Sequence, residues 1–587
     1  MKKLWRLSPD APQTFYDTHP ELLPIVARLL YHRGLVTQEK IDEFLSPDYS
    51  EDIHDPFLFR DMAKAVERIF LAVERQEKIT IHGDYDADGV SASVILASVF
   101  KTLGLNFDVF LPHRETDGYG LNLRTVDMLG SQGTKLIITC DCGISNSNEI
   151  ARANVLGMDV IVTDHHSIPA ELPHAFAIIH PKVEGETYPD QTLAGGGVAF
   201  KLAQGILKRH KETNEKLPNG DRHEAFEKWL LDMVAIASVA DMVPLLGESR
   251  TLTKYGLIVL NKTKRIGLQK LLLEARLLNE DGTNRRELSA DTIGFQIAPR
   301  INAAGRMNHA NVAYNLLMTD DALEATNLAF ELNQNNQERQ KATDEIVAEA
   351  TEQIETERLD QPVLFAFGPW PLGIVGLIAS RIKDKFQKPT IIMCQNGGVS
   401  GSGRSIPGFD MIAALQEMPE YFAKFGGHPM ACGFALKDPS QLNDMKKTLR
   451  QKFLEKTAGL DLTPTLQIDA EIALEDVNWD LYDVLDKFKP FGQQNERPTY
   501  VAYGLTVTGL EPVGADGKHL RIMVKHKTPK IKKTIGWNLC KDGDGCVNWG
   551  KALHNGDKID MVFEIDVNEW NGNRELQLKI IDLHKSV

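Results

Sequence analysis

The sequence predicts an α/β protein: two α/β core domains joined by a long helix, with a C-terminal β-barrel and a helical N-terminal segment. Short apolar strands alternate with helical segments from residue 78 to about 245, which is typical of a parallel sheet with helices packed on it. A polar helical pattern runs from 320 to 360, well beyond an average helix length. Strand-like runs separated by turns fill the last part of the chain and favour a small barrel.

Length and composition limit the possible architectures. A chain of 587 residues is too long for one hydrophobic core, so several domains are expected. With 42% hydrophobic and 25% charged residues the composition is that of a soluble globular protein, and no apolar run has the length of a membrane span. The domain ranges that we predict are 1–75, 76–319, 320–360, 361–460 and 461–587.

The net charge and the cysteines further limit the class of protein that this sequence can encode. The net charge of −15 argues against a general binder of polyanions, but it does not exclude nucleic acid, because basic residues can be confined to one face. The cysteines form no CxxC pair, which predicts reduced thiols in a cytoplasmic protein. They are Cys140, Cys142, Cys394, Cys432, Cys540 and Cys546.

Two regions that are predicted to be helical contain no pattern of residues typical of a catalytic or binding site. In the N-terminal segment, residues 20–30 and 37–45 have helical spacing, and an amphipathic helix at 62–75 leads into the first strand. The long helix at 320–360 is densely charged, so we interpret it as a spacer between two domains rather than as part of a core.

Residues 78–90, KITIHGDYDADGV, carry the strongest chemical signal in the chain. A short strand ends in Asp84, Asp86 and Asp88, and the chain then turns into an apolar helix. Three carboxylates at alternate positions repel one another and are costly to desolvate, and a bound divalent cation removes both problems. Mg²⁺ and Mn²⁺ take oxygen ligands, and Mn²⁺ also accepts imidazole, as in His82. The alternative is a solvated, Asp-rich turn.

Three more apolar segments end in acids or histidines. Each has an ordinary interpretation by itself: a helix cap, a surface pair of histidines, or a polar residue after a helix. Because parallel sheets bind ligands beyond the carboxyl ends of their strands, their joint occurrence favours one metal site at that edge. The residues are Asp141 after a strand at 135–140, Asp164, His165 and His166 after a strand at 159–163, and Asp241 after a helix at 233–240.

Arginines and serines among small residues mark candidate phosphate contacts. Arginine suits bidentate phosphate recognition, and glycine lets a backbone approach an anion closely. The alternative is plain turn packing, and the glycines at 193–198 are by themselves weak support for a phosphate loop. The candidates are Arg114 in the loop at 111–120, Asn302 and Arg306 in IAPRINAAGRM, Ser402, Arg404 and Ser405 in GSGRS, and His428 in FGGHPMACG.

The last domain is predicted to be an OB-like barrel with a basic face. Seven lysines and arginines and no acid occur from 518 to 533, and Trp537, Trp549 and Trp570 follow. A basic groove with aromatic side chains is how single nucleic-acid strands are held, and the alternative is a solvated hairpin with tryptophans in the core. The strands are expected at 498–508, 518–525, 533–539, 558–567 and 574–583, and the candidate contacts are Lys518, Arg521 and Lys525.

The motifs as a set resemble a known family. GDYDADG, CDCG, DHH and ADMVPL resemble the four motifs of the DHH phosphoesterase superfamily, whose core is a DHH domain and a DHH-associated domain. Together with PRINAAGRM, GSGRS, FGGHPMACG and PFGQQNERP they resemble the RecJ family of bacterial exonucleases. The resemblance implies a metal-dependent 5′→3′ exonuclease that hydrolyses single-stranded DNA to 5′-mononucleotides in DNA recombination and repair.

The resemblance also implies roles for individual residues. For one divalent metal, Mn²⁺ or Mg²⁺, it implies Asp86, Asp141 and either His82 or Asp84; for a second metal, Asp88, Asp141, His165 and Asp241. Asp164 would orient a histidine and His166 would contact the scissile phosphate, although the division between His165 and His166 stays open. A pocket for the 5′-phosphate would use Arg114, Arg306, Ser402 and Arg404.

Two other functions remain as alternatives. One is a small-substrate phosphoesterase of the same superfamily that acts on oligonucleotides or dinucleotides, and the barrel argues against it. The other is a non-catalytic scaffold that binds single strands, and the intact set of acids and histidines argues against that. The family further implies a single-strand-binding protein and a helicase as partners, and we expect a monomer with no membrane association.

Overall fold

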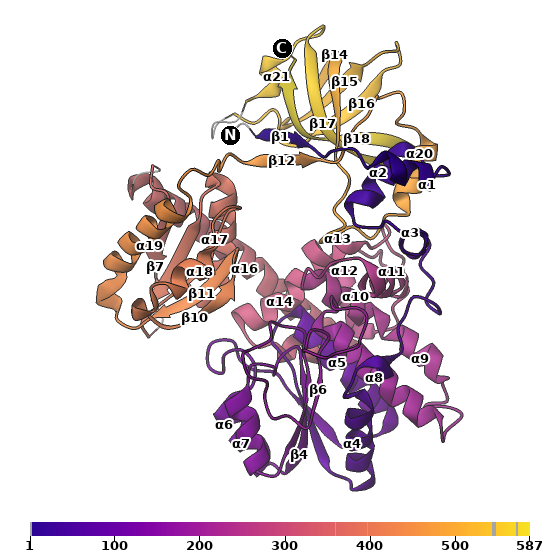
Figure 1. Ribbon diagram of the computed structural model, residues 1–587, viewed down its shortest axis with the longest axis vertical. Coiled ribbons are helices and arrows are strands. Elements are labelled where there is room, and N and C mark those ends of the chain that lie inside the picture. The colour runs from indigo at the N-terminus through magenta and orange to yellow at the C-terminus, as the bar shows by residue number, and fades with distance from the viewer. Residues whose placement is uncertain (1–2, 358–359, 396, 543–546, 571–572, 587) are drawn as a thin grey trace. The chain divides into compact units, whose positions relative to one another are not determined.

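The computed structural model describes residues 3–357, 360–395, 397–542, 547–570 and 573–586 (Figure 1). The chain forms two compact units. Unit 1 consists of residues 1–52, 244–251 and 463–587, and unit 2 consists of residues 53–243 and 252–462. The predicted fold class is confirmed, but the N-terminal segment is divided between the units, so residue 75 is not a boundary between them.

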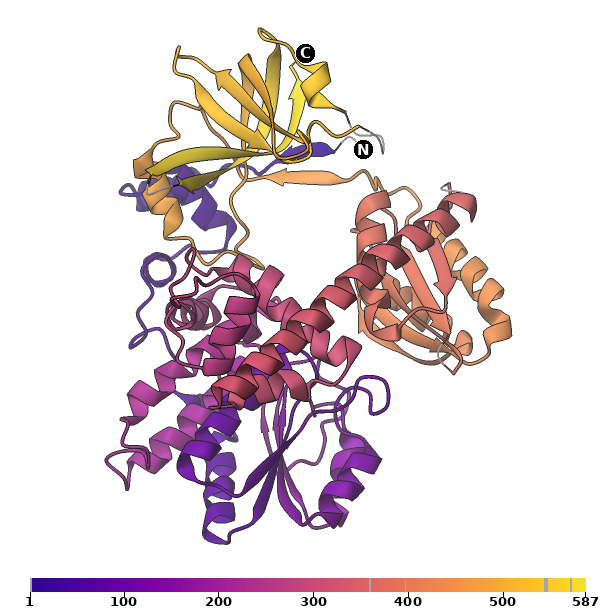
Figure 2. The same ribbon diagram turned by 180° about the vertical axis from the view of Figure 1, so that it is seen from behind.

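Unit 2 contains the predicted parallel sheet. Its strand order is β3-β2-β4-β5-β6, and all neighbouring strands are parallel. Helices α6 and α7 cover one face, and α4, α5 and α8 cover the other (Figures 1 and 2). The strands are β2 (Lys78–His82), β3 (Phe107–Phe110), β4 (Thr134–Cys140), β5 (Asp159–Thr163) and β6 (Ala177–Ile179). The helices are α4 (Met62–Glu74), α5 (Ala87–Leu103), α6 (Leu123–Ser131), α7 (Ser147–Val155) and α8 (Gly195–Lys211).

Helical residues between about 223 and 318 complete this part of unit 2. The apolar helix α10 ends at the residue before Asp241, and it packs on α5 and α8. The elements are α9 (His223–Trp229), α10 (Leu231–Ala240), α11 (Gly247–Leu260), α12 (Ile266–Glu274), α13 (Ala290–Thr292), the π-helical turn η2 (Ile293–Ile297), α14 (Ala298–Met307) and α15 (Asn311–Met318). Residues 247–251 of α11 belong to unit 1, and the short helix η1 (Pro56–Leu58) precedes α4 in unit 2.

A helix of 36 residues, α16 (Ala322–Glu357), occupies the region of the expected long helix. It differs from a solvated spacer, because one stripe of it is buried. Ala325 and Leu332 are fully buried in its first half, which packs on α12, α14 and α15. Ala350 and Ile354 are buried in its second half with α17 (Leu372–Phe386). The dense charge at the remaining positions favoured the spacer interpretation, although most of the buried positions are apolar: Ala325, Ala329, Leu332, Ile346, Ala350 and Ile354.

The following sheet of unit 2 is mixed, with strand order β10-β11-β9-β8-β7. Helices α16 and α17 pack on one face of this sheet, and α18 and α19 pack on the other. The two faces therefore contribute to two separate hydrophobic clusters. The strands are β7 (Leu364–Gly368), β8 (Thr390–Gln395), β9 (Val399–Arg404), β10 (Phe422–His428) and β11 (Ala431–Leu436). The remaining elements are α18 (Met411–Gln416), η3 (Pro419–Tyr421), η4 (Pro439–Gln441) and α19 (Leu442–Lys456).

Unit 1 is built on the predicted barrel. The sheet order β13-β14-β15-β16-β18-β17 is closed by a further pairing of β14 with β17, so five strands encircle the core. All five expected strands are present. They are β14 (Tyr500–Val513), β15 (His519–Lys525), β16 (Lys532–Gly536), β17 (Lys558–Trp570) and β18 (Asn573–Lys585); β12 (Thr465–Ile468), β13 (Ala470–Glu471), α20 (Trp479–Asp486) and α21 (Trp549–Ala552) accompany them.

The N-terminal residues belong to the same unit as the barrel. A strand that the sequence did not predict, β1 (Leu4–Leu7), pairs in parallel with β12. Phe15, Leu29 and Phe44 share one hydrophobic core with Tyr500 and Phe563 of the barrel. The N-terminal helices are α1 (Gln13–Thr18), α2 (Pro24–His32) and α3 (Gln38–Leu45).

Among the residues that the structure describes, no helix combines the length and the apolar character needed to cross a membrane.

Candidate metal centre

The strand order of the parallel sheet brings the carboxyl ends of β2 and β4 side by side. Chain connections leave these two strands in opposite directions, and such a switch point leaves a crevice in which α/β proteins bind ligands. Asp84 and Asp86 follow β2, Asp88 lies in the first turn of α5, and Asp141 follows β4. The topology therefore collects acids that lie far apart in the sequence.

Three groups of side chains present their ligand atoms within 4.8 Å of one another. Asp141 belongs to two of the groups, and so does His165, so the groups are contiguous. This geometry allows one carboxylate, that of Asp141, to face two cation positions. The groups are Asp84, Asp86 and Asp141; Asp141, His165 and His166; and Asp88, His165 and Asp241.

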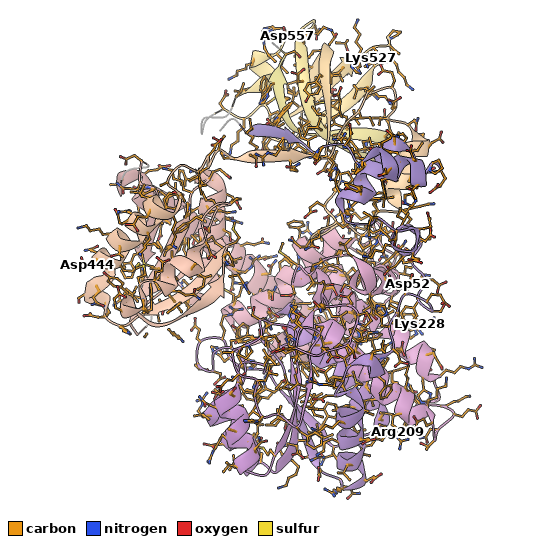
Figure 3. All side chains as sticks on the ribbon, in the orientation of Figure 1. Asp52, Arg209, Lys228, Asp444, Lys527 and Asp557 are labelled. Carbon is orange, nitrogen blue, oxygen red and sulfur yellow. The ribbon has the colours of Figure 1, made fainter. Side chains whose placement is uncertain are left out.

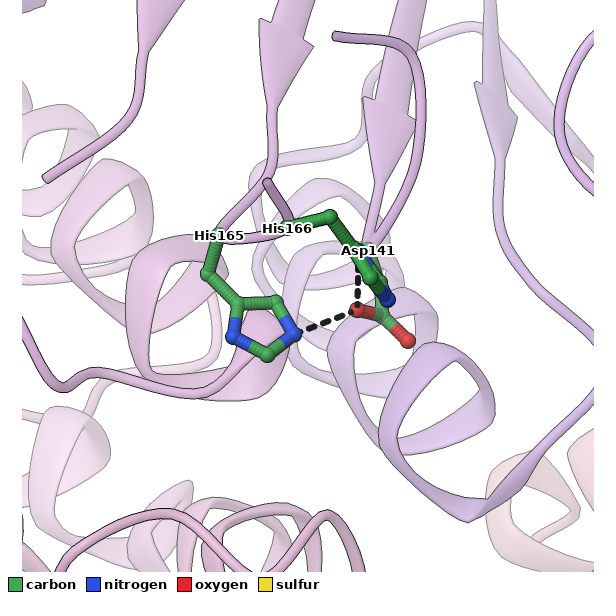
Figure 4. Close-up of side chains that lie close together, drawn as sticks. All are labelled: Asp141, His165 and His166. Atoms are coloured by element: carbon green, nitrogen blue, oxygen red, sulfur yellow. Dashed lines mark ion pairs between the residues drawn. The ribbon is translucent and has the colours of Figure 1, made fainter. Parts of the chain in front are cut away.

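The two adjacent histidines both face the carboxylate of Asp141, but their other partners differ (Figure 4). His165 is buried, and its Nε2 lies 3.1 Å from Asp141 Oδ1, 3.7 Å from Asp88 Oδ2 and 3.5 Å from Asp241 Oδ2. The Nδ1 atom of His166 lies 2.8 Å from Asp164 Oδ1, and 36% of the His166 side chain is exposed. Only His165 therefore reaches both Asp88 and Asp241.

Asp164 holds the turn that carries both histidines. Its carboxylate accepts hydrogen bonds from the backbone N–H groups of His165 at 2.7 Å, His166 at 3.1 Å and Ile144 at 2.9 Å. Burial by itself would raise the pKa of Asp164, but the hydrogen bond from His166 and the backbone donors lower it to about 2. In turn, the Asp164 carboxylate raises the pKa of His166 to about 9, against the opposing effect of burial. His166 is thus a cation beside the metal site.

The remaining acids cannot all be ionised without a cation. Burial, followed by repulsion from neighbouring carboxylates, raises the pKa of Asp84, Asp88 and Asp141 well above the usual value, and that of Asp241 to about 7. Asp84 Oδ1, Asp141 Oδ1 and His165 Nε2 are buried and have no hydrogen-bond partner among the described residues. Hard oxygen donors with one imidazole fit Mn²⁺ or Mg²⁺.

Backbone geometry positions two of the acids. Asp141 has a φ of 63°, in the left-handed region that costs free energy for a residue other than glycine. Asp88 accepts hydrogen bonds from the backbone N–H groups of Gly195 at 2.8 Å and Gly196 at 2.6 Å, at the start of α8. A Cβ atom on Gly195 would lie 2.5 Å from Asp141 Cβ. The glycine-rich turn thus packs against carboxylates, and its role is to orient ligands.

Two residues at the site carried no usable signal in the sequence. The Tyr119 hydroxyl donates to the carbonyl of Asp141 at 3.0 Å and lies 3.0 Å from His166 Nδ1. Lys182 Nζ donates to the carbonyl of His165 at 2.5 Å. Both side chains hold backbone next to ligands from loops outside the recognised motifs, so only the fold could place them.

His82 is an exception among the predicted ligands. Its ring is fully buried, its Nδ1 lies 3.8 Å from Cys142 Sγ, and its Nε2 has no partner among the described residues. Burial lowers the pKa of His82 to about 4. Of the two alternatives left open by the sequence, the structure brings Asp84 and not His82 into a ligand group.

Three of the predicted phosphate contacts lie together beside the acids. The Arg114 guanidinium stacks over the Tyr85 ring at 4.0 Å. Burial, followed by repulsion from Arg114, lowers the pKa of Arg306 to about 10. Arg306 Nη1 donates to the carbonyl of Gly373 at 2.8 Å. Asn302 is different, because its Oδ1 accepts the backbone N–H of Ala87 at 2.8 Å and thereby holds the acidic loop.

Of the candidate phosphate contacts predicted in the mixed sheet, only Ser402 and Arg404 lie together. Arg404 donates to Ser402 Oγ at 2.8 Å and to Ser380 Oγ at 3.1 Å, and a Cβ on Gly376 would meet Arg404 Nη2 at 2.8 Å. Gly376 and Gly373 lie on one turn of α17, so that turn contacts both Arg404 and Arg306.

The other two candidate phosphate contacts of the mixed sheet, Ser405 and His428, do not lie with Ser402 and Arg404. The prediction that Ser405 contacts a phosphate is wrong, because Ser405 is buried and its hydroxyl donates to the carbonyl of Phe409 at 2.6 Å. Ser405 therefore stabilises a turn. His428 is exposed at the end of β10.

The basic stretch of the barrel is less positive than its sequence indicates. Lys518 pairs with Asp516 at 3.4 Å, and Arg521 pairs with Glu511 at 2.7 Å. Glu511 lies on the neighbouring strand β14, and Asp516 lies in the turn two residues before Lys518, so both are outside the range 518–533. Lys525 is exposed, and Lys527 lies on the barrel (Figure 3). Trp537 is 56% exposed and Trp549 is half-buried, whereas the side chain of Trp570 is outside the described residues.

Family models match three parts of the chain. The DHH family N-terminal domain matches residues 78–238, the DHHA1 domain matches 360–455, and the RecJ OB domain matches 468–582. The first match covers the parallel sheet and the acids, the second covers the mixed sheet, and the third covers the barrel.

Relatives match over nearly the whole chain. The single-stranded-DNA-specific exonuclease RecJ of Bacillus subtilis is 36% identical over 565 residues, which are 96% of this chain and 68% of the relative. The protein of the same name from Escherichia coli is 34% identical over 592 residues, which cover 96% of each chain. RecJ from Thermus thermophilus in complex with Mn²⁺ has a TM-score of 0.81 at 26% identity, covering 100% of this chain and 80% of that one. Its Mg²⁺ complex has a TM-score of 0.75 at 24% identity, covering 100% and 79%.

Proposed function

The chain belongs to the RecJ family, and on that premise we propose that it is a metal-dependent exonuclease that hydrolyses the phosphodiester bonds of single-stranded DNA. The observation that carries the proposal is the contiguous set of ligand groups that share Asp141 at the switch point of the sheet. A relic scaffold would have no reason to keep buried acids whose ionisation requires a cation.

The proposed metals are two divalent cations, Mn²⁺ or Mg²⁺. Asp84, Asp86 and Asp141 would hold one of them, and Asp88, Asp141, His165 and Asp241 would hold the other. When bound, the two ions supply a hydroxide at neutral pH and stabilise the charge that develops on the phosphate oxygens. The protein contributes the buried, preorganised ligands and excludes bulk water from them.

His166 is the side chain that we propose for contact with the scissile phosphate. Its Nδ1 is held by Asp164 at 2.8 Å, so the ring is oriented and its Nε2 is available to donate to a phosphate oxygen. The raised pKa of His166, about 9, keeps this donor charged at neutral pH. A cationic donor at this position opposes the charge that builds up in the transition state.

Degradation in the 5′→3′ direction requires a site that recognises the 5′ end of the DNA. We propose Arg114, Arg306, Ser402 and Arg404 as a pocket for the 5′-phosphate, supported by the shared contact of Arg306 and Arg404 with one turn of α17. Arginines whose pKa is lowered by burial and by another arginine gain free energy when an anion binds between them. Such an end sensor would give 5′→3′ degradation to 5′-mononucleotides.

The test uses a long single strand labelled at its 3′ end, with a 5′-phosphate or a 5′-hydroxyl. We expect stepwise shortening of the labelled strand with Mn²⁺, none with EDTA, none on a blunt duplex, and slower shortening without the 5′-phosphate. Immediate release of the labelled nucleotide would contradict the polarity. Preferential cleavage of dinucleotides would support the small-substrate phosphoesterase instead, and binding without cleavage would support the scaffold.

A role in DNA recombination and repair is a proposal that the family suggests, as are a single-strand-binding protein and a helicase as partners. We also propose a monomer in a reducing, cytoplasmic compartment. The support for the compartment is that Cys140, Cys142, Cys394, Cys432 and Cys540 are all free thiols.

A further inference from the structure

Unit 1 contains a cavity of about 530 Å³ that the metal centre does not use. It is lined by residues of the N-terminal helix α2, the short strand β13 and the helix α20, and the ribbon shows α2 and α20 side by side at the barrel (Figure 1). Its volume lies within the range of protein sites that hold small ligands. The N-terminal segment, which carried no chemical pattern in the sequence, supplies about half of its wall.

The floor of the cavity is apolar. Leu23, the residue before α2, and Ile25 of α2 line it together with Ile472 and Leu481. Leu23 is 44% exposed, although it sits at the start of a helix whose other leucines are buried. An exposed leucine in a concave apolar site gains free energy when a partner side chain covers it.

The rim of the cavity is acidic. Glu471, Asp476 and Asp480 line it and are exposed. The basic residue in the lining is Arg28, whose charge is already matched by Asp10 at 2.6 Å. Arg28 is only 9% exposed, and its Nε has no hydrogen-bond partner among the described residues. The cavity thus combines excess negative charge with one unused buried N–H donor.

An open sheet edge borders the cavity. β13 is the terminal strand of its sheet, and in the described part of the chain it pairs with β14 on one side only. β1 covers the preceding strand, β12, as far as Ile468, where the N–H of Ser8 donates to the carbonyl of Ile468 at 2.8 Å. The chain then leaves the sheet, so the edge is uncovered where the cavity begins. Edge strands of this kind accept an extended peptide as an additional strand.

We propose that this cavity is a docking site for an extended segment of a partner protein in which apolar and basic residues alternate. Apolar side chains would fill the floor beside Leu23 and Ile472, and lysines or arginines would face Glu471 and Asp480. The same charges disfavour phosphates and acidic peptides.

The probe is the blocked, fluorescein-labelled hexapeptide Lys-Ile-Lys-Val-Lys-Leu, titrated with the full-length protein by fluorescence polarisation. We expect saturable binding that weakens with salt. Two comparison peptides, Glu-Ile-Glu-Val-Glu-Leu and Lys-Ser-Lys-Ser-Lys-Ser, test the charge and the apolar requirement, and we expect neither to bind. No saturable binding of the first peptide up to about 1 mM, or equal binding of all three, would overturn the proposal.

Matched variants locate the site. Asp480→Lys should weaken binding of the first peptide by about fivefold or more, whereas Asp483→Lys, an exposed acid on the same helix outside the cavity lining, should not. Leu23→Ser should weaken it, whereas Leu4→Ser, a comparably exposed leucine outside the cavity lining, should not. All four variants should keep the exonuclease rate and the melting temperature. Equal effects of Asp480→Lys and Asp483→Lys would contradict a specific cavity.

Discussion

At the scale of single residues, Asp141 connects the ligand groups of the metal centre. It belongs to two of the three groups and adopts a φ of 63° directly after β4. The left-handed turn swings its carboxylate over the sheet edge toward His165, and the glycine at 195 leaves room for it. Backbone strain of this kind persists only where the surrounding fold over-determines the conformation.

The first prediction concerns the charge of this residue. Asp141→Asn keeps the shape of the side chain but removes the anionic donor that faces both cation positions. We expect Mn²⁺ affinity, measured by calorimetry, and the exonuclease rate each to fall by more than about a hundredfold, because even a residue outside the ligand shell costs up to that factor. Asp127→Asn, a surface acid paired with Arg152, is the control and should change neither. A variant with normal Mn²⁺ affinity would contradict the shared-ligand geometry.

The second prediction concerns protons. The raised pKa values of Asp84, Asp88, Asp141 and Asp241 mean that the metal-free site binds protons that a metal must displace. Mn²⁺ affinity should therefore rise as the pH rises from about 6 to about 8, around the pKa of about 7 for Asp241. Calorimetry in buffers of different ionisation enthalpy should show proton release. A buffer-independent enthalpy would refute this.

The same raised pKa values also determine how the stability of the metal-free protein depends on pH. An acid whose pKa is higher in the folded than in the unfolded chain favours the folded state at low pH, and this contribution is lost as the pH rises through the folded pKa. The metal-free protein should therefore lose stability from about pH 4 to pH 7, the window between the usual pKa of an aspartate and that of Asp241, and added Mn²⁺ should restore it.

At the scale of elements, the start of α8 orients a metal ligand. The N–H groups of Gly195 and Gly196 bind both oxygens of Asp88, and neither glycine has space for a Cβ atom. Gly197 belongs to the same turn, but its Cβ would meet only the flexible side chain of Leu193, at 3.2 Å.

The third prediction uses this difference. Gly195→Ala should displace Asp141, because the new Cβ would lie 2.5 Å from Asp141 Cβ, and the Mn²⁺ affinity should fall by about tenfold or more. Gly197→Ala should have a small effect on it. The two substitutions have the same cost in backbone freedom, so the comparison separates ligand displacement from helix propensity. Thermal melting in EDTA checks that both variants fold, and equal Mn²⁺ affinities would show that α8 does not position the ligands.

At the scale of the whole molecule, the unit that contains the barrel is not built from residues 461–587 alone. Its core includes Phe15, Leu29 and Phe44 from the N-terminal segment. Arg250, which lies in the inserted segment 244–251, is fully buried and donates to the carbonyls of Phe44 and Phe488, among others. Three stretches of the sequence are thus joined in one unit.

The fourth prediction concerns truncation. Deleting 463–587 should expose the apolar faces of α1 to α3 and remove the carbonyls of Lys487, Phe488, Lys489 and Pro490 that Arg250 donates to. The truncated chain should therefore bind a hydrophobic dye and aggregate, in addition to losing affinity for DNA. The control is Lys525→Glu with Lys527→Glu, which should weaken DNA binding and leave dye binding unchanged. A truncated chain that stays monomeric and free of dye would show that the N-terminal segment folds independently.

Local patterns in the sequence determined the two α/β sheets, the barrel strands, the long helix and the set of acids and histidines, because period-2 and helical spacing and charged strand ends are local signals. The tertiary structure decided what depends on distant neighbours. It placed Asp84 and not His82 in a ligand group, gave the Ser405 hydroxyl a partner in the turn at Phe409, and paired Arg521 with Glu511 of the neighbouring strand. It also joined the N-terminal segment to the barrel, because burial and ion pairing are set by residues that only folding brings together.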